Sequence, residues 1–543
     1  MNLVAPTNKA PSDKGVFTRQ SSGLVRELGL PSAIAIALAS TVVVSTFINF
    51  YAGLAGFTQA DMIVPLVLAA LIWIVAMFAY SYLVNAIPRA GGEYVYLSRI
   101  ITPAVGAIAG LSLAVVLLYY LAGSANYVAN YLPFTLLALG SAFNSPAITD
   151  SASQITSTSA IAVIGALNLL IVGALSMFPL RQVARIIMAV VIVSFASYFS
   201  VVVLLVTHSH GDFEAALAQF SNHPNAYNDI MAAAATDKIP LGISWTTALL
   251  VIPFMFLNYA GVLWNYYVAG ELRRPGRTYI WASVATIAIL AAVWLASWTI
   301  MLNTVGRDFM QAQAQLGATD ASAYGAITSL PSTTNGLGYG LVLSGDPITK
   351  ILIGIAIPAG SIGVQLVYMV IATRILFALA FDGLLPIGLA KLDRRGVPMN
   401  GLLVVLVGAI GFTVLNAYGT ITTVVSNLSL FVALTVLAGS IAAFALPIRR
   451  PDLMMKPGAT DVARFAGIPV ASLWGAASAI LAFTMIAMII GNQSVFGTFT
   501  VVSVGALLIV FATGPILYLV VRQVKMRRSS IDIRLAMREL PPE

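Results

Sequence analysis

Apolar runs, most of them long enough for a membrane helix, follow one another along this chain from about residue 31 to residue 522. A helix needs about 20 apolar residues to cross the hydrocarbon core of a bilayer. The chain is 59% hydrophobic and 9% charged, which is too apolar for a soluble globular protein of 543 residues. We therefore predict an all-α polytopic membrane protein with twelve spans, at approximately 31–54, 62–87, 100–130, 159–178, 184–206, 245–269, 279–302, 348–374, 400–418, 421–447, 469–491 and 496–521.

Lys and Arg are distributed unevenly over the segments between these spans. If the N-terminus is cytoplasmic, all but three of the 28 basic residues fall on the cytoplasmic side; the exceptions are Lys238, Arg307 and Lys350. Such a bias in short loops sets the orientation of membrane proteins, so we expect both termini in the cytoplasm and the protein in the plasma membrane. This topology accounts for the net charge of +8 without a nucleic-acid partner. The basic segment 522–528 is suited to contact anionic membrane lipid.

The sequence gives no sign of catalytic chemistry. It contains no cysteine, and no nucleophile–base pair or phosphate-binding loop is recognisable. We predict that the protein is not an enzyme and needs no cofactor. Residues 1–27 are polar and lack a short apolar region followed by a cleavage site, so the first span is expected to be retained.

Three long outer loops are expected, at about 131–158, 207–244 and 303–347. Loops of this length either pack as caps or stay mobile. All three histidines, His208, His210 and His223, lie in the second loop, and histidines at such spacing could hold a metal. Because no clear fourth ligand accompanies them, we interpret this loop as solvated and polar, and we predict no metal site.

One span carries a polar interruption. Within the stretch from Ile252 to Ala282, an apolar helix is interrupted between Leu257 and Gly261 by the sequence Leu-Asn-Tyr-Ala-Gly. In lipid such a break is tolerated only against protein or a water-filled cavity, where the freed backbone groups can hold a solute. The alternative is a glycine kink in an ordinary span. We interpret the stretch as a discontinuous helix at a solute site.

Three cytoplasmic stretches carry further motifs. The first is a turn after the second span, the second follows the broken span, and the third follows the eighth span. They read Pro88-Arg-Ala-Gly-Gly-Glu93-Tyr-Val-Tyr96, Glu271-Leu-Arg-Arg-Pro-Gly-Arg277, and Arg374 through Asp382-Gly-Leu-Leu-Pro386.

Together with the span count, these stretches resemble the amino acid–polyamine–organocation (APC) transporter superfamily over roughly residues 24–522. The resemblance implies a LeuT-type fold, in which two inverted repeats of five helices are followed by two additional helices and spans 1 and 6 are broken. The expected organisation is a cytoplasmic tail at 1–27, a ten-helix core at 28–447 with repeats at about 28–206 and 245–447, helices 11 and 12 at 448–522, and a cytoplasmic tail at 523–543.

The function that the resemblance implies is secondary active transport. The protein would be a permease that moves amino acids by alternating access, either by ion-coupled symport or by exchange. One alternative is a carrier for polyamines or another organic amine or acid. The other is a non-transporting amino acid sensor on the same fold, which the short cytoplasmic tails disfavour.

The resemblance also assigns candidate residues for the solute in span 6. There it implies that Tyr259 is an aromatic gate over the solute and that Asn258 adds a side-chain hydrogen bond. The family's Phe-Ala-Tyr-x-Gly pattern falls on Leu257, Asn258, Tyr259, Ala260 and Gly261.

Span 1 departs from the family pattern, which usually has Gly-Ser-Gly at the break. This chain has Val44, Ser45 and Thr46 there, and a positive φ at Val or Thr costs roughly 1–3 kcal/mol. Either side chains of this span meet the solute's carboxylate, or the solute is not an ordinary α-amino acid. Tyr120, in the third span, is expected to line the same pathway.

The coupling ion is left open between H⁺ and Na⁺. No expected span carries an ionisable residue near its middle, where ion pathways usually have one. Ser361 in span 8 is the hydroxyl that best fits a sodium site. Glu93 and Glu271 are either proton acceptors near the cytoplasmic side or anchors that hold loops to the bundle. With Arg277 and Asp382 they make up the expected cytoplasmic gate.

Overall fold

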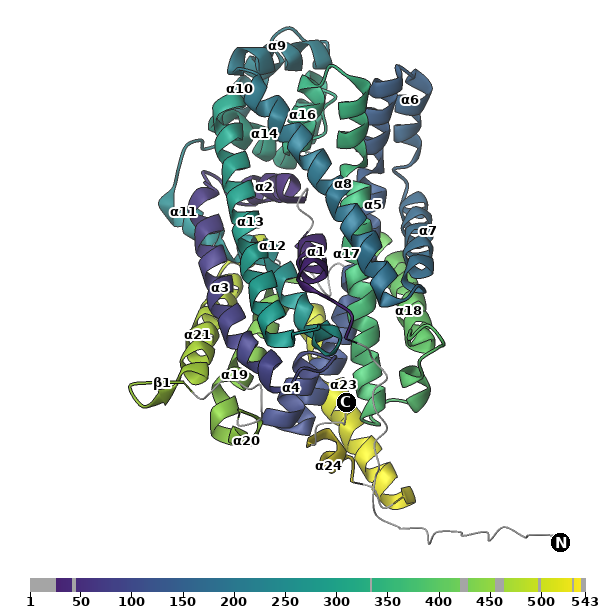
Figure 1. The fold of residues 1–543 in the computed structure, drawn as a ribbon. Helices are drawn as coiled ribbons and strands as arrows, with labels where there is room; N and C mark the ends of the chain where they lie inside the picture. The colour runs from purple at the N-terminus through teal and green to yellow at the C-terminus, as the bar shows by residue number, and fades with distance from the viewer. Residues whose placement is uncertain are drawn as a thin grey trace, which may run out of the picture.

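The computed structural model describes residues 26–41, 45–332, 335–419, 428–454, 463–496, 500–529 and 532–538. This part of the chain is almost entirely helical, and its one sheet is the hairpin of β1 (Arg464–Phe465) and β2 (Ile468–Pro469). Eleven of its helices are long and apolar enough to cross a membrane (Figure 1), which confirms the prediction of an all-α polytopic membrane protein. They are Ile63–Ala86 (α3), Pro103–Phe143 (α5), Thr158–Ser176 (α7), Leu180–Thr207 (α8), Trp245–Glu271 (α11, α12 and η1), Pro275–Thr304 (α13), Pro347–Phe381 (α17), Met399–Ala417 (α18), Leu430–Arg449 in α19 (Leu428–Arg449), Val470–Gly491 (α21) and Leu507–Arg528 in α23 (Val501–Ser529).

The first predicted span is divided into two shorter helices and is therefore absent from that count. α1 (Leu30–Thr41) and α2 (Ser45–Gly56) flank residues 42–44, which lie outside the described residues. Figure 1 shows both halves within the bundle, with α2 lying across it. The eleven long helices correspond to predicted spans 2–12, and α1 and α2 occupy the position of predicted span 1.

The sixth span is broken at the place that the sequence predicts. α11 (Trp245–Leu250) and α12 (Ile252–Asn258) are followed by the 3₁₀ helix η1 (Ala260–Glu271). A Cβ atom on Gly261 would lie 2.4 Å from Thr41 Cγ2 and 2.7 Å from the Thr41 backbone nitrogen. Glycine is thus required for η1 to cross the end of α1. A twelve-residue 3₁₀ helix is unusual, and long 3₁₀ segments often mark hinges or strained sequences.

Three long helices pack together beside the broken spans. α17 contacts α5 and α8, and it also contacts α1 and η1. α5 continues to Phe143, although the sequence predicted an outer loop from residue 131. Its outer part contains Pro133, yet it stays helical while packed on α17, where Thr135 Oγ1 donates a hydrogen bond of 2.8 Å to the Gly354 carbonyl. α6 (Pro146–Gln154) then packs back against α5.

The second and third outer loops are largely helical and packed, so the interpretation of the second as a loop was wrong, although many of its side chains are exposed. Their Ala-rich segments form helices that bury their apolar faces against one another. Side chains also attach them to the end of the first span, because Gln311 Nε2 donates to the Ala60 carbonyl (3.1 Å) and Gln315 Nε2 to that of Leu54 (2.5 Å). We call this group the outer cap: α9 (His210–Ser221), α10 (Ala226–Thr236), α14 (Arg307–Thr319), α15 (Ala321–Ile327) and α16 (Asn335–Leu343).

The histidines of this region take part in separate contacts. His223 Nε2 lies 2.6 Å from Asp229 Oδ2, and His210 Nε2 lies 3.3 Å from Glu214 Oε1. Within the described ranges, no three His, Cys, Asp or Glu side chains come together as a metal site.

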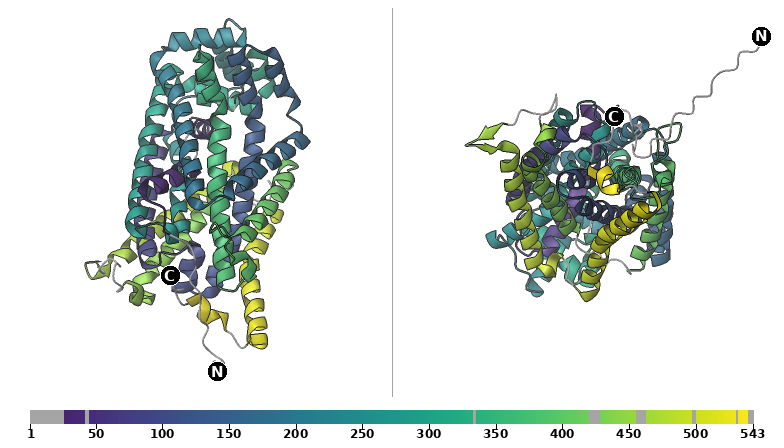
Figure 2. Two further views of the ribbon diagram at one scale, coloured as in Figure 1. Left: turned by 45° about the vertical axis from the view of Figure 1, so that its right-hand side comes forward. Right: turned by 90° about the horizontal axis from the view of Figure 1, so that it is seen from below.

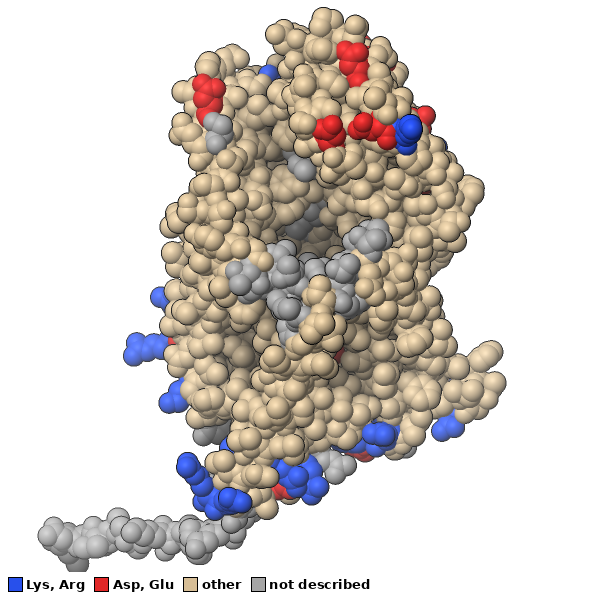
Figure 3. All heavy atoms as spheres, turned by 180° about the vertical axis from the view of Figure 1, so that it is seen from behind, with Lys and Arg blue, Asp and Glu red and all other residues tan. Residues whose placement is uncertain are grey.

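The end of the bundle opposite the outer cap, here called the inner end, carries the described N-terminal residues and several short helices (Figures 1 and 2). On the face drawn in Figure 3, Lys and Arg gather at the inner end, Asp and Glu lie mostly at the outer cap, and the surface is hollowed at mid-height. The described short helices not yet named are α4 (Glu93–Ile100), η3 (Ile387–Ala390), α20 (Pro451–Met454), α22 (Gln493–Phe496) and α24 (Ile533–Arg538).

Candidate functional site

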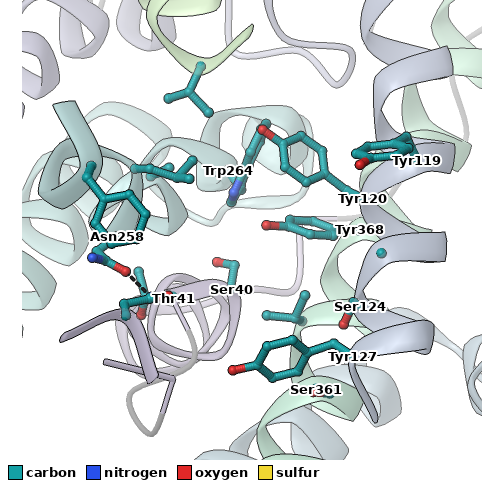
Figure 4. Close-up of a pocket in the computed structure, with 17 residues that line it drawn as sticks. Ser40, Thr41, Tyr119, Tyr120, Ser124, Tyr127, Asn258, Trp264, Ser361 and Tyr368 are labelled. Atoms are coloured by element: carbon teal, nitrogen blue, oxygen red, sulfur yellow. Dashed lines mark hydrogen bonds between the residues drawn. The ribbon is translucent and has the colours of Figure 1, made fainter. Parts of the chain in front are cut away.

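A cavity of about 320 Å³ lies where the two broken spans meet α5 and α17 (Figure 4). This volume lies within the range of small-molecule sites. We call it the central cavity. It is lined by Ser40, Thr41, Asn49, Tyr119, Tyr120, Gly123, Ser124, Tyr127, Phe254, Leu257, Asn258, Ala260, Trp264, Ser361, Val364, Tyr368 and Val432.

The polar side chains of the central cavity are uncharged. Asn49 Nδ2 donates a hydrogen bond to Asn258 Oδ1, which joins α2 to α12. Ser40 Oγ lies 3.1 Å from the Gly261 carbonyl oxygen, so α1 and η1 also meet here. No Asp, Glu, Lys, Arg or His is among the described residues of the lining. Because burying an unpaired charge is costly, the cavity suits a ligand without net charge.

Aromatic rings form a second wall of the cavity. The ring of Tyr368 lies 5.4 Å from that of Tyr120 and 5.7 Å from that of Trp264, so three elements contribute to one aromatic surface. In Figure 4 the hydroxyl of Tyr127 points across the cavity toward α1. That buried hydroxyl has no hydrogen-bond partner among the described residues. It is therefore available to an acceptor group on a ligand.

At the inner end, the second and third motifs meet in a buried ion pair. Arg374 Nε and Nη2 donate to the two carboxylate oxygens of Glu271, at 2.7 and 3.1 Å, and both side chains are 5% exposed. The backbone of the same segment pairs with the entrance to α1, because Leu28 N donates to the Glu271 carbonyl (2.9 Å) and Arg273 N to the Leu28 carbonyl (3.0 Å). The pair thus connects α17, η1 and the start of α1.

A second buried ion pair connects the first and third motifs. Arg99 Nη2 lies 2.6 Å from Asp382 Oδ2, and Tyr94 donates a hydrogen bond of 2.5 Å to the same oxygen. The side chains of Arg99 and Asp382 are both 2% exposed. α4 is thereby fixed to the end of α17.

The third buried carboxylate of the inner end, Glu93, contacts phenols instead. Tyr80 donates to its Oε1 at 3.0 Å, Tyr266 donates to the same oxygen, and Tyr267 donates to Oε2. Glu93 begins α4, between two membrane spans. Burial raises its pKa to about 7, although the three phenol hydrogen bonds act in the opposite direction.

The turn before Glu93 depends on two glycines. Gly91 and Gly92 have φ angles of +112° and +56°, and a Cβ atom on Gly92 would lie 2.2 Å from Tyr267 Cε1. The turn that the sequence predicts after the second span is confirmed, and it is closely packed.

A comparison with protein families agrees with this architecture. The family model described as amino acid permease matches residues 28–517. The chain belongs to the amino acid permease family. A search of curated proteins finds no match for this permease. The family match confirms the expected membership of the APC superfamily. It indicates a transporter of amino acids, and the matched family is not a family of enzymes.

The structure brings four of the expected solute and ion residues of the permease to the central cavity: Leu257, Asn258, Tyr120 and Ser361. Gly261 lies beside it, where its role is the close crossing of η1 and α1.

Tyr259, expected as an aromatic gate, lies elsewhere in the permease. It is fully buried, is absent from the cavity lining, and packs with its ring 4.7 Å from that of Trp294 on α13. The position follows from helix rotation, because Asn258 and Tyr259 point to different sides of α12. The cavity has other aromatic residues in its lining, among them Tyr120, Tyr368 and Trp264.

The structure describes only some of the residues expected at the break in span 1. Val44 lies outside the described residues. Ser45 and Thr46 are the first two residues of α2. Ser40, Thr41 and Asn49 are the described residues of this span that line the cavity.

Three of the four residues expected at the cytoplasmic gate are buried in contacts with other side chains. Glu271 and Asp382 form ion pairs and Glu93 bonds to tyrosines, but Arg277 is exposed at the start of α13. The sequence did not reveal the partners of these carboxylates, which are Arg99, Tyr80, Tyr266 and Tyr267. It also did not reveal Tyr127 and Trp264 at the central cavity. The one local signal was the aromatic sequence from Trp264 to Tyr267, directly after the helix break.

Proposed function

We propose that this permease carries amino acids across the plasma membrane by alternating access, with the solute bound in the central cavity. The observation that carries the proposal is that described residues on both sides of each break, such as Thr41 and Asn49 in span 1 and Asn258 and Ala260 in span 6, line one cavity. Transporters of this architecture use broken helices to hold solute with backbone groups. Net movement would require symport with an ion, or else exchange of one solute for another.

We further propose that the preferred solutes are amino acids with uncharged side chains. A zwitterion requires donors for its carboxylate and acceptors for its amine, and hydroxyls, amides and freed backbone groups supply both. The unpartnered hydroxyl of Tyr127 is a donor for the carboxylate. The aromatic wall formed by Tyr120, Tyr368 and Trp264 suits an apolar side chain, and aromatic faces also attract an ammonium group. A polyamine would bring several positive charges into a lining that offers no described carboxylate.

For orientation, we propose that the inner end faces the cytoplasm. The support is the concentration of Lys and Arg at that end (Figure 3) together with the positive-inside rule. The proposed division of the chain remains a core at 28–447, two additional helices at 448–522 and tails at 1–27 and 523–543.

The proposal can be tested with purified permease in liposomes. Labelled amino acids, polyamines and simple organic acids are offered separately, and uptake is compared with that of protein-free liposomes. We expect uptake of uncharged amino acids. Uptake of polyamines alone would overturn the solute assignment, and saturable binding without uptake would instead favour a sensor.

A single hydroxyl deletion tests the site. Tyr127→Phe should raise the KM for amino acids about 10- to 150-fold, since a hydrogen bond to a charged group contributes about 1.5–3 kcal/mol. Tyr418→Phe is the matched control, because Tyr418 is 60% exposed at the end of α18. Equal KM values in the two variants would remove Tyr127 from the site.

A further inference from the structure

Glu93 differs from the other buried carboxylates of the inner end. Glu271 and Asp382 each face a guanidinium group, at 2.7 and 2.6 Å. Glu93, 2% exposed, receives hydrogen bonds from three phenols and forms no ion pair among the described residues. An ionised carboxylate buried without a cation is unfavourable. The site therefore favours uptake of a proton by Glu93.

The groups that face Glu93 from the elements packed around it are tyrosines. α3 contributes Tyr80 and η1 contributes Tyr266 and Tyr267, while Tyr96 of α4 and Tyr279 of α13 act on it from farther away. Arg99 of α4 is engaged by Asp382. On the remaining side, α5, α19 and α23 contribute uncharged residues, with Ser112 and Thr435 as the polar ones.

The hydrogen bonds around Glu93 can be completed in either protonation state. The hydroxyl of Tyr80 has one proton but two acceptors, Glu93 Oε1 at 3.0 Å and the Thr435 carbonyl at 2.9 Å. With Glu93 ionised, Tyr80 donates to the carboxylate. With Glu93 protonated, the carboxyl O–H donates to the Tyr80 oxygen, and Tyr80 donates to Thr435. Protonation thus reverses the hydrogen bond between Tyr80 and Glu93 of α4 and directs the Tyr80 proton to the Thr435 carbonyl of α19.

Glu93 also borders space in which water can deliver a proton. A cavity of about 190 Å³ between α4, α5, α19 and α23 has Glu93, Ser112 and Thr435 in its lining. A cavity of this size has room for water, and Glu93, Ser112 and Thr435 are the polar side chains in a described lining that is otherwise apolar.

Two of the three phenols belong to η1, the inner limb of the broken sixth span. Hydrogen bonds to an ionised carboxylate are roughly twice as strong as those to a neutral group. Loss of a proton from Glu93 therefore strengthens the attachment of η1 to α4, and gain of a proton weakens it. Since the outer end of η1 lines the central cavity through Ala260 and Trp264, the two sites share one moving element.

We propose that Glu93 is the proton-binding site of this permease, taking up and releasing one proton per transport cycle and thereby releasing and fastening η1. The proposal rests on the proposed function, because it assigns the coupling ion of the same transport reaction.

Two transport assays on reconstituted full-length protein separate the proposals. The first is exchange of labelled for unlabelled amino acid at equal pH on both sides, which needs no proton gradient and no net movement of protons. The second is accumulation driven by an inward proton gradient. Wild type should perform both, and Glu93→Gln should retain exchange but lose accumulation. If wild type performs neither, the proposed function fails. If wild type exchanges but ignores the proton gradient, or if Glu93→Gln accumulates normally, the assignment of Glu93 is overturned.

A milder pair of variants covers the case in which Glu93→Gln fails to fold. Tyr267→Phe removes one donor to the carboxylate, so the pH midpoint of uptake should shift upward. Tyr96→Phe is the matched control, because its buried hydroxyl has no hydrogen-bond partner among the described residues although it lies in the same helix as Glu93. Equal midpoints in the two variants would overturn the proposal.

Infrared difference spectra of wild type between pH 6 and 8 give a readout without transport. We expect the signal of a protonated carboxyl group to change over this range, and the absence of that signal would also overturn the proposal.

Discussion

Removal of one guanidinium group at the inner end should destabilise the protein strongly. Arg374→Met leaves Glu271 without the side chain that meets both of its carboxylate oxygens, at 2.7 and 3.1 Å. Both side chains are 5% exposed, so little water can replace the lost partner. Breaking a buried pair from one side costs about 3–5 kcal/mol. We expect a loss of that size in the free energy of unfolding.

The double variant Glu271→Gln/Arg374→Met distinguishes the ion pair from simple packing. A buried pair replaced on both sides by neutral groups is often no less stable, so the second substitution should recover most of what the first one loses. Unfolding can be followed by tryptophan fluorescence during titration with denaturing detergent. Arg277→Met is the control: Arg277 is exposed, and surface substitutions usually stay within about 0.5 kcal/mol.

Two results would refute this reasoning. One is a loss for Arg374→Met that is no larger than the loss for Arg277→Met. The other is a double variant as unstable as Arg374→Met alone, which would show that the volume or shape of the side chain matters more than its charge.

Two further substitutions give separate tests. Gly261→Ala places a methyl group 2.4 Å from Thr41 Cγ2, so it should abolish most transport by separating η1 from α1. Gly411→Ala is the control: no atom lies within 4 Å of its Cβ position, so uptake should be unchanged. Normal uptake by Gly261→Ala would show that η1 and α1 do not cross closely during transport. Glu93 has a folded-state pKa of about 7, raised from 4.5 mainly by burial, so the folded protein binds its proton more tightly than the unfolded chain does. The stability that comes from this difference is complete below about pH 4.5 and is lost as pH rises toward 7 and above. Between pH 5 and 8, unfolding titrations should therefore show wild type losing roughly 2–3 kcal/mol more than Glu93→Gln; parallel pH profiles would show that Glu93 does not titrate in this range.

The sequence was sufficient for the membrane class and for the break in span 6, because both depend on local patterns. Apolar length determines a span, and the Asn258 to Gly261 interruption is visible without neighbours. The outer part of α5 was missed because Pro133 is typical of a helix end, whereas contact with α17 keeps this segment helical.

The partners at the inner end could not be predicted in the same way. Arg374 and Glu271 are 103 residues apart, and Arg99 and Asp382 are 283 apart. Their pairing depends on how α4, η1 and α17 pack, which no local pattern encodes. The same holds for Tyr259, since the rotation of α12 about its axis decides whether it or Asn258 faces the central cavity.

The uncharged lining of the central cavity has an electrical consequence. A zwitterionic solute adds no net charge to walls that carry none, so the loaded and empty carriers differ in charge only by the ion that travels with the solute. A current recorded across a membrane that contains the permease would then count coupling ions directly. Symport with a proton would carry one elementary charge per amino acid, and exchange of two neutral solutes would be electrically silent.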